Sequence, residues 1–184
     1  MLYILIGKSA SGKDTILNGL VKNGFTPLIS HTTRQAREGE TEGKEYYFVS
    51  DGDFEKLLKQ DRFVETREYH TLLHNVPQTW HYGLSKQELE SNKNYTVIVD
   101  VMGAKQLLAY YGEENCKVCY IYLDDKTRTE RAKARGSFCD HEWSRRMVAD
   151  NKDFCELNLS ALPHKLYYNK YEVDYIIDLI KNQK

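Results

Sequence analysis

The sequence lacks several features that would place it in a specialised class of protein. Lys plus Arg number 26 and Asp plus Glu number 27, and this balance is not the basic excess of a dedicated nucleic-acid-binding protein. No apolar run approaches the ~20 residues that a membrane-spanning helix requires. The first residues lack the basic region and the small-residue cleavage site of a secretory signal. We therefore expect a cytoplasmic protein whose partners include neither nucleic acid nor membrane.

Cysteine is also scarce, with four residues in a chain of 184. Cys116 and Cys119 form a single CxxC, and the sequence offers no second CxxC or spaced histidine pair to complete a tetrahedral zinc site. The pair leads into an apolar segment, whereas a redox-active CxxC usually opens a helix. We interpret both cysteines as core or strand residues, and their low number favours a reducing compartment.

The chain does contain short apolar segments that alternate with helical patterns. Strands are predicted at 2–6, 96–101, 118–123 and 165–168, and the first two are expected to be buried. Helices are predicted at 13–21, 103–111, 125–135, 140–159 and 173–180. Strands that alternate with helices imply right-handed crossovers and a parallel sheet, so the predicted fold class is α/β.

The middle of the chain differs from this pattern because it is richer in polar residues, glycine and tyrosine. Short strands are predicted at 45–49 and 63–68, and Asp51 is expected to cap a helix over 54–58. This composition indicates a small mixed β insert within the α/β protein. The predicted division places the core at 1–29 and 93–184, and the insert at 30–92.

The most informative motif is a glycine-rich loop that fits G-x-x-x-x-G-K and lies where a strand passes into a helix. Such a loop directs backbone N–H groups at phosphate oxygens, and the helix N-terminus adds a partial positive charge. Lys13 is spaced to reach the β- and γ-phosphates of a nucleotide. The residues expected to bind ATP are Gly7, Lys8, Ser9, Ala10, Ser11, Gly12, Lys13, Asp14 and Thr15.

Asp14 departs from the strict form of this motif, which has Ser or Thr at that position as a ligand of Mg²⁺. A carboxylate also suits Mg²⁺, because this ion prefers oxygen ligands. In the absence of a metal, the charge of Asp14 would repel phosphate. We therefore predict that Asp14 lies on or near the Mg²⁺ that accompanies ATP.

A second anion-binding pattern follows the loop. Arg34 and Arg37 are three residues apart and are followed by Tyr46. Arginine forks bind phosphate through two hydrogen bonds at once. A second anion site after a phosphate-binding loop suggests an acceptor substrate that itself carries a phosphate.

The order and spacing of the motifs resemble those of the guanylate kinases, from residue 2 to about residue 169. The similar segments are Thr-Thr-Arg-x-x-Arg-x-Gly-Glu at 32–40, Gly-Lys-Glu-Tyr-x-Phe-Val-Ser at 43–50, Phe-Val-Glu at 63–65, Tyr-Gly at 82–83, Val-Asp-Val-Met-Gly-Ala-Lys at 99–105, Arg-x-x-x-Arg-Gly at 131–136 and Arg-Arg at 145–146. The resemblance implies a P-loop NTPase fold in which helices flank a parallel sheet. It also implies an insert that binds the monophosphate and a helical lid at about 125–147.

The resemblance further implies a role for each matching residue. The acceptor phosphate would be held by Arg34, Arg37, Tyr46 and Tyr82, with Glu40 bridging the arginines. Guanine would be read by Ser30, Glu65 and Asp100. The catalytic residues would be Lys13, Arg34, Arg131, Arg135 and Arg146. The implied reaction is the Mg²⁺-dependent conversion of ATP and GMP, or dGMP, to ADP and GDP, or dGDP, by a monomer or homodimer whose partners are nucleotides.

Three departures leave the acceptor open. Leu84 replaces a usual hydroxyl that helps to read the base, Ile98 replaces a usual Asp, and 71–80 resembles an insertion. We interpret the insertion as a longer hairpin, although it could instead cover the base pocket. One alternative is a kinase for another nucleoside monophosphate or for ribose 1,5-bisphosphate. Another is a non-catalytic guanylate-kinase-like interaction module, against which Lys13 and the lid arginines argue.

Overall fold

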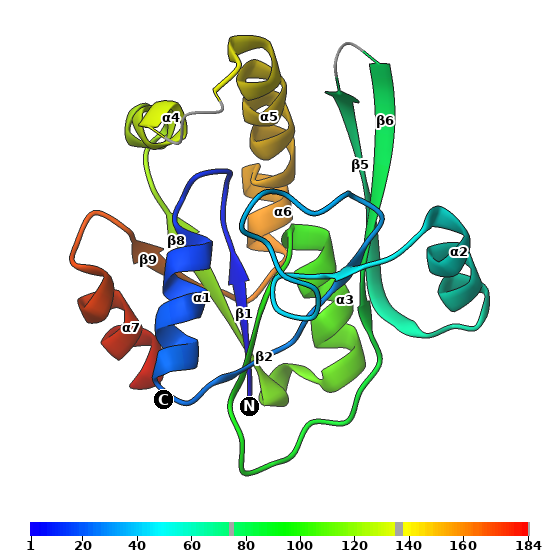
Figure 1. Ribbon diagram of the computed structural model, residues 1–184. Helices are drawn as coiled ribbons and strands as arrows, with labels where there is room; N and C mark the ends of the chain where they lie inside the picture. Colours follow the sequence, from blue (N-terminus) through cyan, green and yellow to red (C-terminus); the bar gives the residue numbers. More distant parts are fainter. Residues whose placement is uncertain (74–75, 135–137, 184) are drawn as a thin grey trace. The chain divides into compact units, whose positions relative to one another are not determined.

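The short apolar segments form a five-stranded parallel sheet, which confirms the α/β prediction (Figure 1). The strand order is β2-β7-β1-β8-β9, and all the pairings are parallel. The strands are β1 (Leu2–Ile6), β2 (Thr26–Pro27), β7 (Tyr95–Ile98), β8 (Cys116–Tyr122) and β9 (Lys165–Tyr168). β1 is the central strand and is buried along its whole length, which explains its unbroken apolar sequence.

The computed structural model describes residues 1–73, 76–134 and 138–183. The chain divides into two units, which are described separately below. The core unit consists of Met1–Pro27 and Ser91–Lys184, and the insert unit consists of Leu28–Glu90. Within the described ranges, no helix has both the length and the apolar character needed to cross a bilayer.

Helices pack on the sheet of the core unit. α1 (Lys13–Lys22) and α7 (Val173–Lys181) share one apolar cluster with alternate side chains of the sheet, including Tyr3 and Leu5. α3 (Val101–Tyr111) contacts β1 and β8, whose remaining side chains point away from that cluster. The other helices of this unit are η1 (Glu113–Asn115), α4 (Asp125–Ala134), α5 (Asp140–Asp153) and α6 (Glu156–Ser160).

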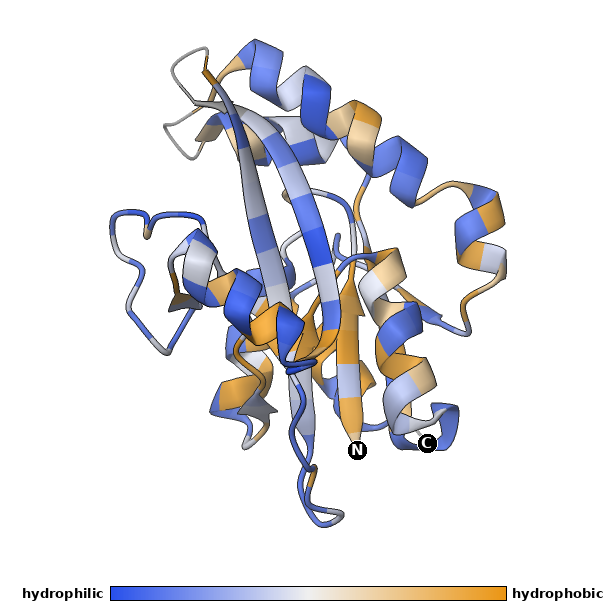
Figure 2. Ribbon diagram, turned by 90° about the vertical axis from the view of Figure 1, so that its right-hand side faces the viewer, coloured by the Kyte–Doolittle hydropathy of each residue, from blue (hydrophilic) through white to orange (hydrophobic). Residues whose placement is uncertain are grey.

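The insert unit contains a mixed four-stranded sheet with the order β4-β3-β6-β5. Its elements are β3 (His31–Thr32), β4 (Tyr47–Phe48), α2 (Asp51–Lys59), β5 (Phe63–Leu73) and β6 (Val76–Ser85). β5 and β6 form a long antiparallel hairpin, coloured mostly white and blue by hydropathy in Figure 2. Phe63 stacks on Phe54 of α2, with ring centroids 4.7 Å apart, and anchors the helix to the hairpin.

The segment 71–80, interpreted from the sequence as a longer hairpin, continues the pairing of β5 and β6 up to Leu73 and Val76. Tyr69 and Trp80 face each other across the two strands, and their rings stack with centroids 6.0 Å apart. Trp80 is therefore a cross-strand partner of Tyr69 that stabilises the outer part of the hairpin.

The strand predicted at 96–101 ends earlier, at Ile98. Asp100 is the N-cap of α3, and its Oδ1 atom accepts a hydrogen bond of 2.7 Å from the backbone N–H of Gly103. The helix consequently begins at Val101 rather than at Gly103. Asp100 lies two residues after the strand, and its capping bond fixes where the helix begins.

Two other predictions require correction. The single helix predicted at 140–159 is two helices, because α5 ends at Asp153 and Phe154 stacks on Tyr120 of β8, with centroids 5.3 Å apart. The cap of α2 is Ser50 rather than Asp51, since the Ser50 hydroxyl accepts from the backbone N–H of Asp53 at 3.1 Å. The first difference reflects a tertiary contact, and the second is a shift of one residue.

Candidate active site

The glycine-rich loop joins the carboxyl end of β1 to α1, and its two glycines are required by close neighbours. A Cβ atom on Gly7 would lie 2.5 Å from the carbonyl oxygen of Ile121 in β8. Gly12 has a φ angle of +94°, and a Cβ atom there would lie 2.3 Å from Nδ2 of Asn169. The loop thus packs tightly on the ends of the sheet, in a conformation that only glycine adopts without strain at Gly12.

Lys13 and Ser11 contribute polar side chains to this loop. The ammonium group of Lys13 donates to the carbonyl oxygens of Gly7 at 2.7 Å and Lys8 at 3.1 Å. Ser11 is fully buried, and its hydroxyl has no hydrogen-bond partner among the residues that the structure describes. An unsatisfied buried hydroxyl costs about 1–3 kcal/mol, so this atom indicates a place where a ligand oxygen or water bonds. Asp14 and Thr15 are exposed in the first turn of α1.

Asn169, which the sequence analysis did not select, connects the loop to the sheet. It follows β9 directly, is 2% exposed, and donates from Nδ2 to the carbonyl oxygen of Ser11 at 2.6 Å. Its backbone N–H donates to Tyr122 at the end of β8 at 2.8 Å. The available signal was a polar residue immediately after a predicted strand, at the sheet edge where α/β proteins bind ligands.

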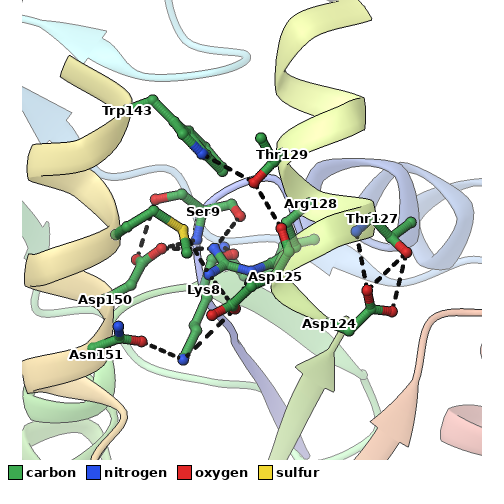
Figure 3. Close-up of polar contacts among 12 residues, drawn as sticks. Lys8, Ser9, Asp124, Asp125, Thr127, Arg128, Thr129, Trp143, Asp150 and Asn151 are labelled. Atoms are coloured by element: carbon green, nitrogen blue, oxygen red, sulfur yellow. Dashed lines mark hydrogen bonds and ion pairs between the residues drawn. The ribbon is translucent and has the colours of Figure 1, made fainter. Parts of the chain in front are cut away.

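A second group missed from the sequence surrounds Arg128 of α4 and is drawn in Figure 3. Arg128 is fully buried and pairs with Asp125 at 2.7 Å and with Asp150 of α5 at 2.8 Å. It also donates to the carbonyl oxygen of Ser9 in the glycine-rich loop at 2.7 Å. The carboxylate of Asp150 accepts from the backbone N–H of Ser9 at 2.9 Å and from its hydroxyl at 3.1 Å. We call Ser9, Asp125, Arg128 and Asp150 the Arg128 cluster.

Neighbouring side chains extend the contacts between the loop and these helices. Lys8 donates to the Oδ1 atom of Asn151 at 2.6 Å. The indole of Trp143 donates to the Thr129 hydroxyl at 3.1 Å, and its ring lies 5.8 Å from the guanidinium carbon of Arg128. Helices α4 and α5 are thus tied to the glycine-rich loop by hydrogen bonds and ion pairs within the core unit.

The arginines predicted to form a lid lie on α4 and α5, except for Arg135, which is outside the described residues. Arg131 donates to the carbonyl oxygen of Asn169 at 3.3 Å. Arg145 and Arg146 each donate from Nε to Glu142 at 2.9 Å. Burial alone would raise the pKa of Glu142, but the hydrogen bonds from these two arginines lower it to about 2.

The second anion-binding pattern forms one polar group within the insert unit. Arg34 is 4% exposed and donates to Glu40 at 2.9 Å and to the carbonyl oxygen of Gln35 at 2.7 Å. Glu40 also accepts from the backbone N–H of Arg37 at 2.8 Å, so it joins the two arginine positions. Burial opposes this arrangement, but the hydrogen bonds lower the pKa of Glu40 and raise that of Arg34.

Aromatic rings border this group. The ring of Tyr46 lies 5.4 Å from the guanidinium carbon of Arg34 and 5.7 Å from the ring of Tyr82. Arg67 of β5 lies over the Tyr82 ring at 4.9 Å and was not selected from the sequence. The signal for Arg67 was its spacing of two residues from Glu65, because alternate residues of a strand share one face. The structure therefore brings a third arginine to the tyrosine side of the group.

The residues predicted to read a base are divided between the two units. Ser30 and Glu65 of the insert unit are both buried, with Glu65 only 2% exposed. Leu84 is fully buried in β6 beside Gly83. In the core unit, Asp100 caps α3, and Ile98 packs against the apolar cluster of α1 and α7.

Comparison with known proteins identifies similar chains. A sequence model of the family described as "Guanylate kinase" matches residues 1–162. A guanylate kinase from Buchnera aphidicola is 32% identical over 186 residues, which cover 96% of this chain and 79% of the relative. A guanylate kinase from Francisella tularensis subsp. holarctica is 37% identical over 121 residues, or 61% of this chain. This match spans 60% of the length of the Francisella protein.

A solved structure supports the same assignment of the fold. The crystal structure of guanylate kinase from Anaplasma phagocytophilum has a TM-score of 0.70 and 22% sequence identity. The match covers 99% of this chain and 82% of that chain. At this level of identity, the similarity concerns the arrangement of strands and helices.

Proposed function

This chain belongs to the guanylate kinase family, and from that premise we propose that it transfers the γ-phosphoryl group of ATP to GMP or dGMP. The observation that carries the proposal is the glycine-rich loop between β1 and α1, with Lys13 folded over it. The products are ADP and GDP or dGDP. Backbone N–H groups, Lys13 and the N-terminus of α1 hold the phosphates of ATP.

The acceptor phosphate is bound by Arg34 and Arg37, together with Tyr46 and Tyr82. Glu40 supports this role because it fixes the Arg34 fork through one oxygen and the Arg37 backbone through the other. A guanidinium held in this way presents its remaining N–H groups to a phosphate without losing further rotamer entropy. The tyrosine hydroxyls add neutral donors.

Guanine is selected by carboxylates and a hydroxyl. Glu65 and Asp100 accept hydrogen bonds from N1–H and the exocyclic amino group, and Ser30 donates to O6. Adenine lacks that donor face, so the hydrogen bonds from guanine to Glu65 and Asp100 would be lost with AMP. A site built to hydrogen-bond a substrate N–H discriminates strongly against an analogue that lacks it.

Phosphoryl transfer requires the protein to align the two substrates and to neutralise the charge on the transferring group, and it requires no covalent chemistry by the protein. Lys13, Arg34, Arg131 and Arg146 supply positive charge around the transferring group, and α4 and α5 act as the lid. We assign Arg135 the same role. Exclusion of water by the lid prevents hydrolysis of ATP without transfer.

The residues of the loop also fit an ion that arrives with ATP. Asp14 presents an exposed carboxylate directly after Lys13. Across the described part of the chain, no three His, Cys, Asp or Glu side chains converge as a ready-made metal site. Mg²⁺ commonly takes one or two protein carboxylates together with substrate phosphates and water, so Asp14 would hold it. When bound, Mg²⁺ neutralises charge on the phosphates.

A coupled assay of ADP release tests the proposal. ATP and Mg²⁺ are supplied with GMP, dGMP, AMP, CMP, UMP, dTMP or ribose 1,5-bisphosphate. We expect turnover with GMP and dGMP, and its loss in Lys13→Met but not in Lys22→Met, which removes the same charge from the last turn of α1. Turnover confined to another acceptor would show that the acceptor substrate is not GMP or dGMP. ATP binding without turnover of any acceptor would favour an interaction module.

A further inference from the structure

The phosphate-binding loop already holds an anion, which is the side chain of Asp150. Oδ2 of Asp150 accepts from the backbone N–H of Ser9 at 2.9 Å and from Nη1 of Arg128 at 2.8 Å. Oδ1 accepts from the Ser9 hydroxyl at 3.1 Å. A main-chain N–H, a hydroxyl and a guanidinium are the donors that proteins use for phosphate oxygens. Figure 3 shows Asp150 extending from α5 towards Ser9 of the loop and Arg128 of α4.

Arg128 does not require Asp150 to neutralise its charge. Its Nε and Nη2 atoms both donate to Oδ1 of Asp125, at 3.3 and 2.7 Å. Nη1 also donates to the carbonyl oxygen of Ser9 at 2.7 Å. Arg128 is fully buried, while the Asp150 side chain retains 13% exposure. The guanidinium is therefore fixed by α4 and the loop, and Asp150 is the member of the cluster that another anion can replace.

We propose that Ser9 and Arg128 form a phosphate subsite for ATP, and that Asp150 is an internal ligand which ATP displaces. This inference rests on the proposed function, because it requires ATP to bind the glycine-rich loop. In the nucleotide-bound protein, a phosphate oxygen accepts the hydrogen bonds from Ser9 and Arg128 that Asp150 accepts in the free protein. Arg128 is then a phosphate-binding residue in addition to those that the resemblance implies.

The exchange connects the loop to the lid. Asp150 and Arg146 are four residues apart on α5 and share one face of that helix. Displacement of Asp150 removes the direct hydrogen bonds between α5 and Ser9. ATP binding thus weakens the attachment to the loop of the helix that carries Arg146, and the Lys8–Asn151 hydrogen bond is a contact that remains.

Calorimetric titration with ATP and Mg²⁺, without an acceptor, tests the displacement. Asp150→Asn keeps the side-chain shape but removes the competing charge, so we expect ATP to bind about tenfold more tightly. Asp140→Asn, which neutralises an exposed residue at the other end of α5, should leave the affinity unchanged. Adding Arg128→Met to Asp150→Asn should abolish the gain, because the guanidinium is lost from the subsite.

The outcomes separate this inference from the proposed function. Equal or weaker ATP binding by folded Asp150→Asn would show that Asp150 is a fixed support of the loop, and this result would overturn the inference. The proposed function would be unaffected if the protein still phosphorylated GMP. If neither the wild type nor any variant bound ATP, the inference and the proposed function would both fail.

A second measurement does not depend on the folding of Asp150→Asn. Trp143 is one of two tryptophans and lies beside Arg128, so Trp80→Phe leaves its emission as the only tryptophan signal. We expect ATP to change this emission in a saturable way, whereas adenosine, which lacks phosphates, should not. Unchanged Trp143 emission at ATP concentrations shown to saturate by calorimetry would overturn the inference.

Discussion

Two glycines with similar φ angles differ in how closely other atoms approach them. Gly12 and Gly24 have φ angles of +94° and +88°, but only Gly12 has an atom within 4 Å of its Cβ position. We expect Gly24→Ala to cost about 1–2 kcal/mol of stability from the left-handed backbone alone. Gly12→Ala should cost more and weaken ATP binding at least about tenfold, because it displaces Asn169 from the loop.

Thermal unfolding and ATP titration of the two variants check this prediction. The comparison isolates the contacts with Asn169 and Arg131, since the left-handed backbone is common to both positions. Similar losses in Gly12→Ala and Gly24→Ala would show that close packing against these two side chains contributes nothing.

Leu84 gives a second prediction for a single residue. Its side chain is fully buried in β6, so Leu84→Ala should lower the free energy of unfolding by about 2–5 kcal/mol. Leu84→Met keeps the volume and should cost less than about 1.5 kcal/mol. Urea unfolding measures both values. A stable Leu84→Ala with altered base preference would instead make Leu84 a residue of the base pocket.

Single residues differ in how far the sequence alone could predict their surroundings. Gly7, Gly12 and Lys13 were found because their spacing is local and they share one loop. Arg128 is 119 residues from Ser9, whose carbonyl oxygen it contacts. A buried arginine in a helix of charged residues has no periodic signal, since its burial depends on partners that only folding brings together.

At the scale of elements, α5 contains an acid-sensitive ion-pair group. The pKa of Glu142 is lowered from 4.5 to about 2, so its contribution to stability is complete above pH ~4.5 and is lost as the pH falls towards 2. We expect the melting temperature of the wild type to fall more steeply over this range than that of Glu142→Gln.

Circular dichroism melts between pH 7 and pH 2.5 measure the difference. Glu156→Gln, an exposed position on α6, controls for the loss of one carboxylate. Parallel pH profiles for the wild type and Glu142→Gln would show that Arg145 and Arg146 do not stabilise ionised Glu142.

The bounds of helices and strands were predicted best where the local sequence alone determines them. β1 has the predicted bounds, because a strand buried on both faces is a continuous apolar run. The break after α5 was missed, because it depends on the stacking of Phe154 on a distant strand. Strands of two residues, such as β2 and β3, are too short to have a pattern of their own.

At the scale of the whole molecule, the thiols report on unfolding of the core unit. Cys116 and Cys119 are buried in β8, and burial raises their pKa values to about 11 and 12. Cys139 is exposed. We expect a thiol reagent at pH 8 to modify Cys139 rapidly, and Cys116 and Cys119 only after denaturant is added.

Mass spectrometry of the labelled peptides identifies the modified cysteines, and Cys139→Ser removes the fast phase. Rapid labelling of Cys119 in the native protein would mean that β8 opens locally without global unfolding.

The α/β class itself was predictable from alternation, since the succession of strands and helices is encoded in the sequence of the core unit.

The position of β1 has a consequence for synthesis on the ribosome. Both of its hydrogen-bonded neighbours, β7 and β8, come much later in the chain. At about 5–20 residues per second, translation from Ile6 to Tyr122 takes roughly 6–23 s. Until β8 has been made, this apolar strand lacks at least one of its two partners. We therefore expect chaperones that shield hydrophobic nascent chains to bind β1 during synthesis.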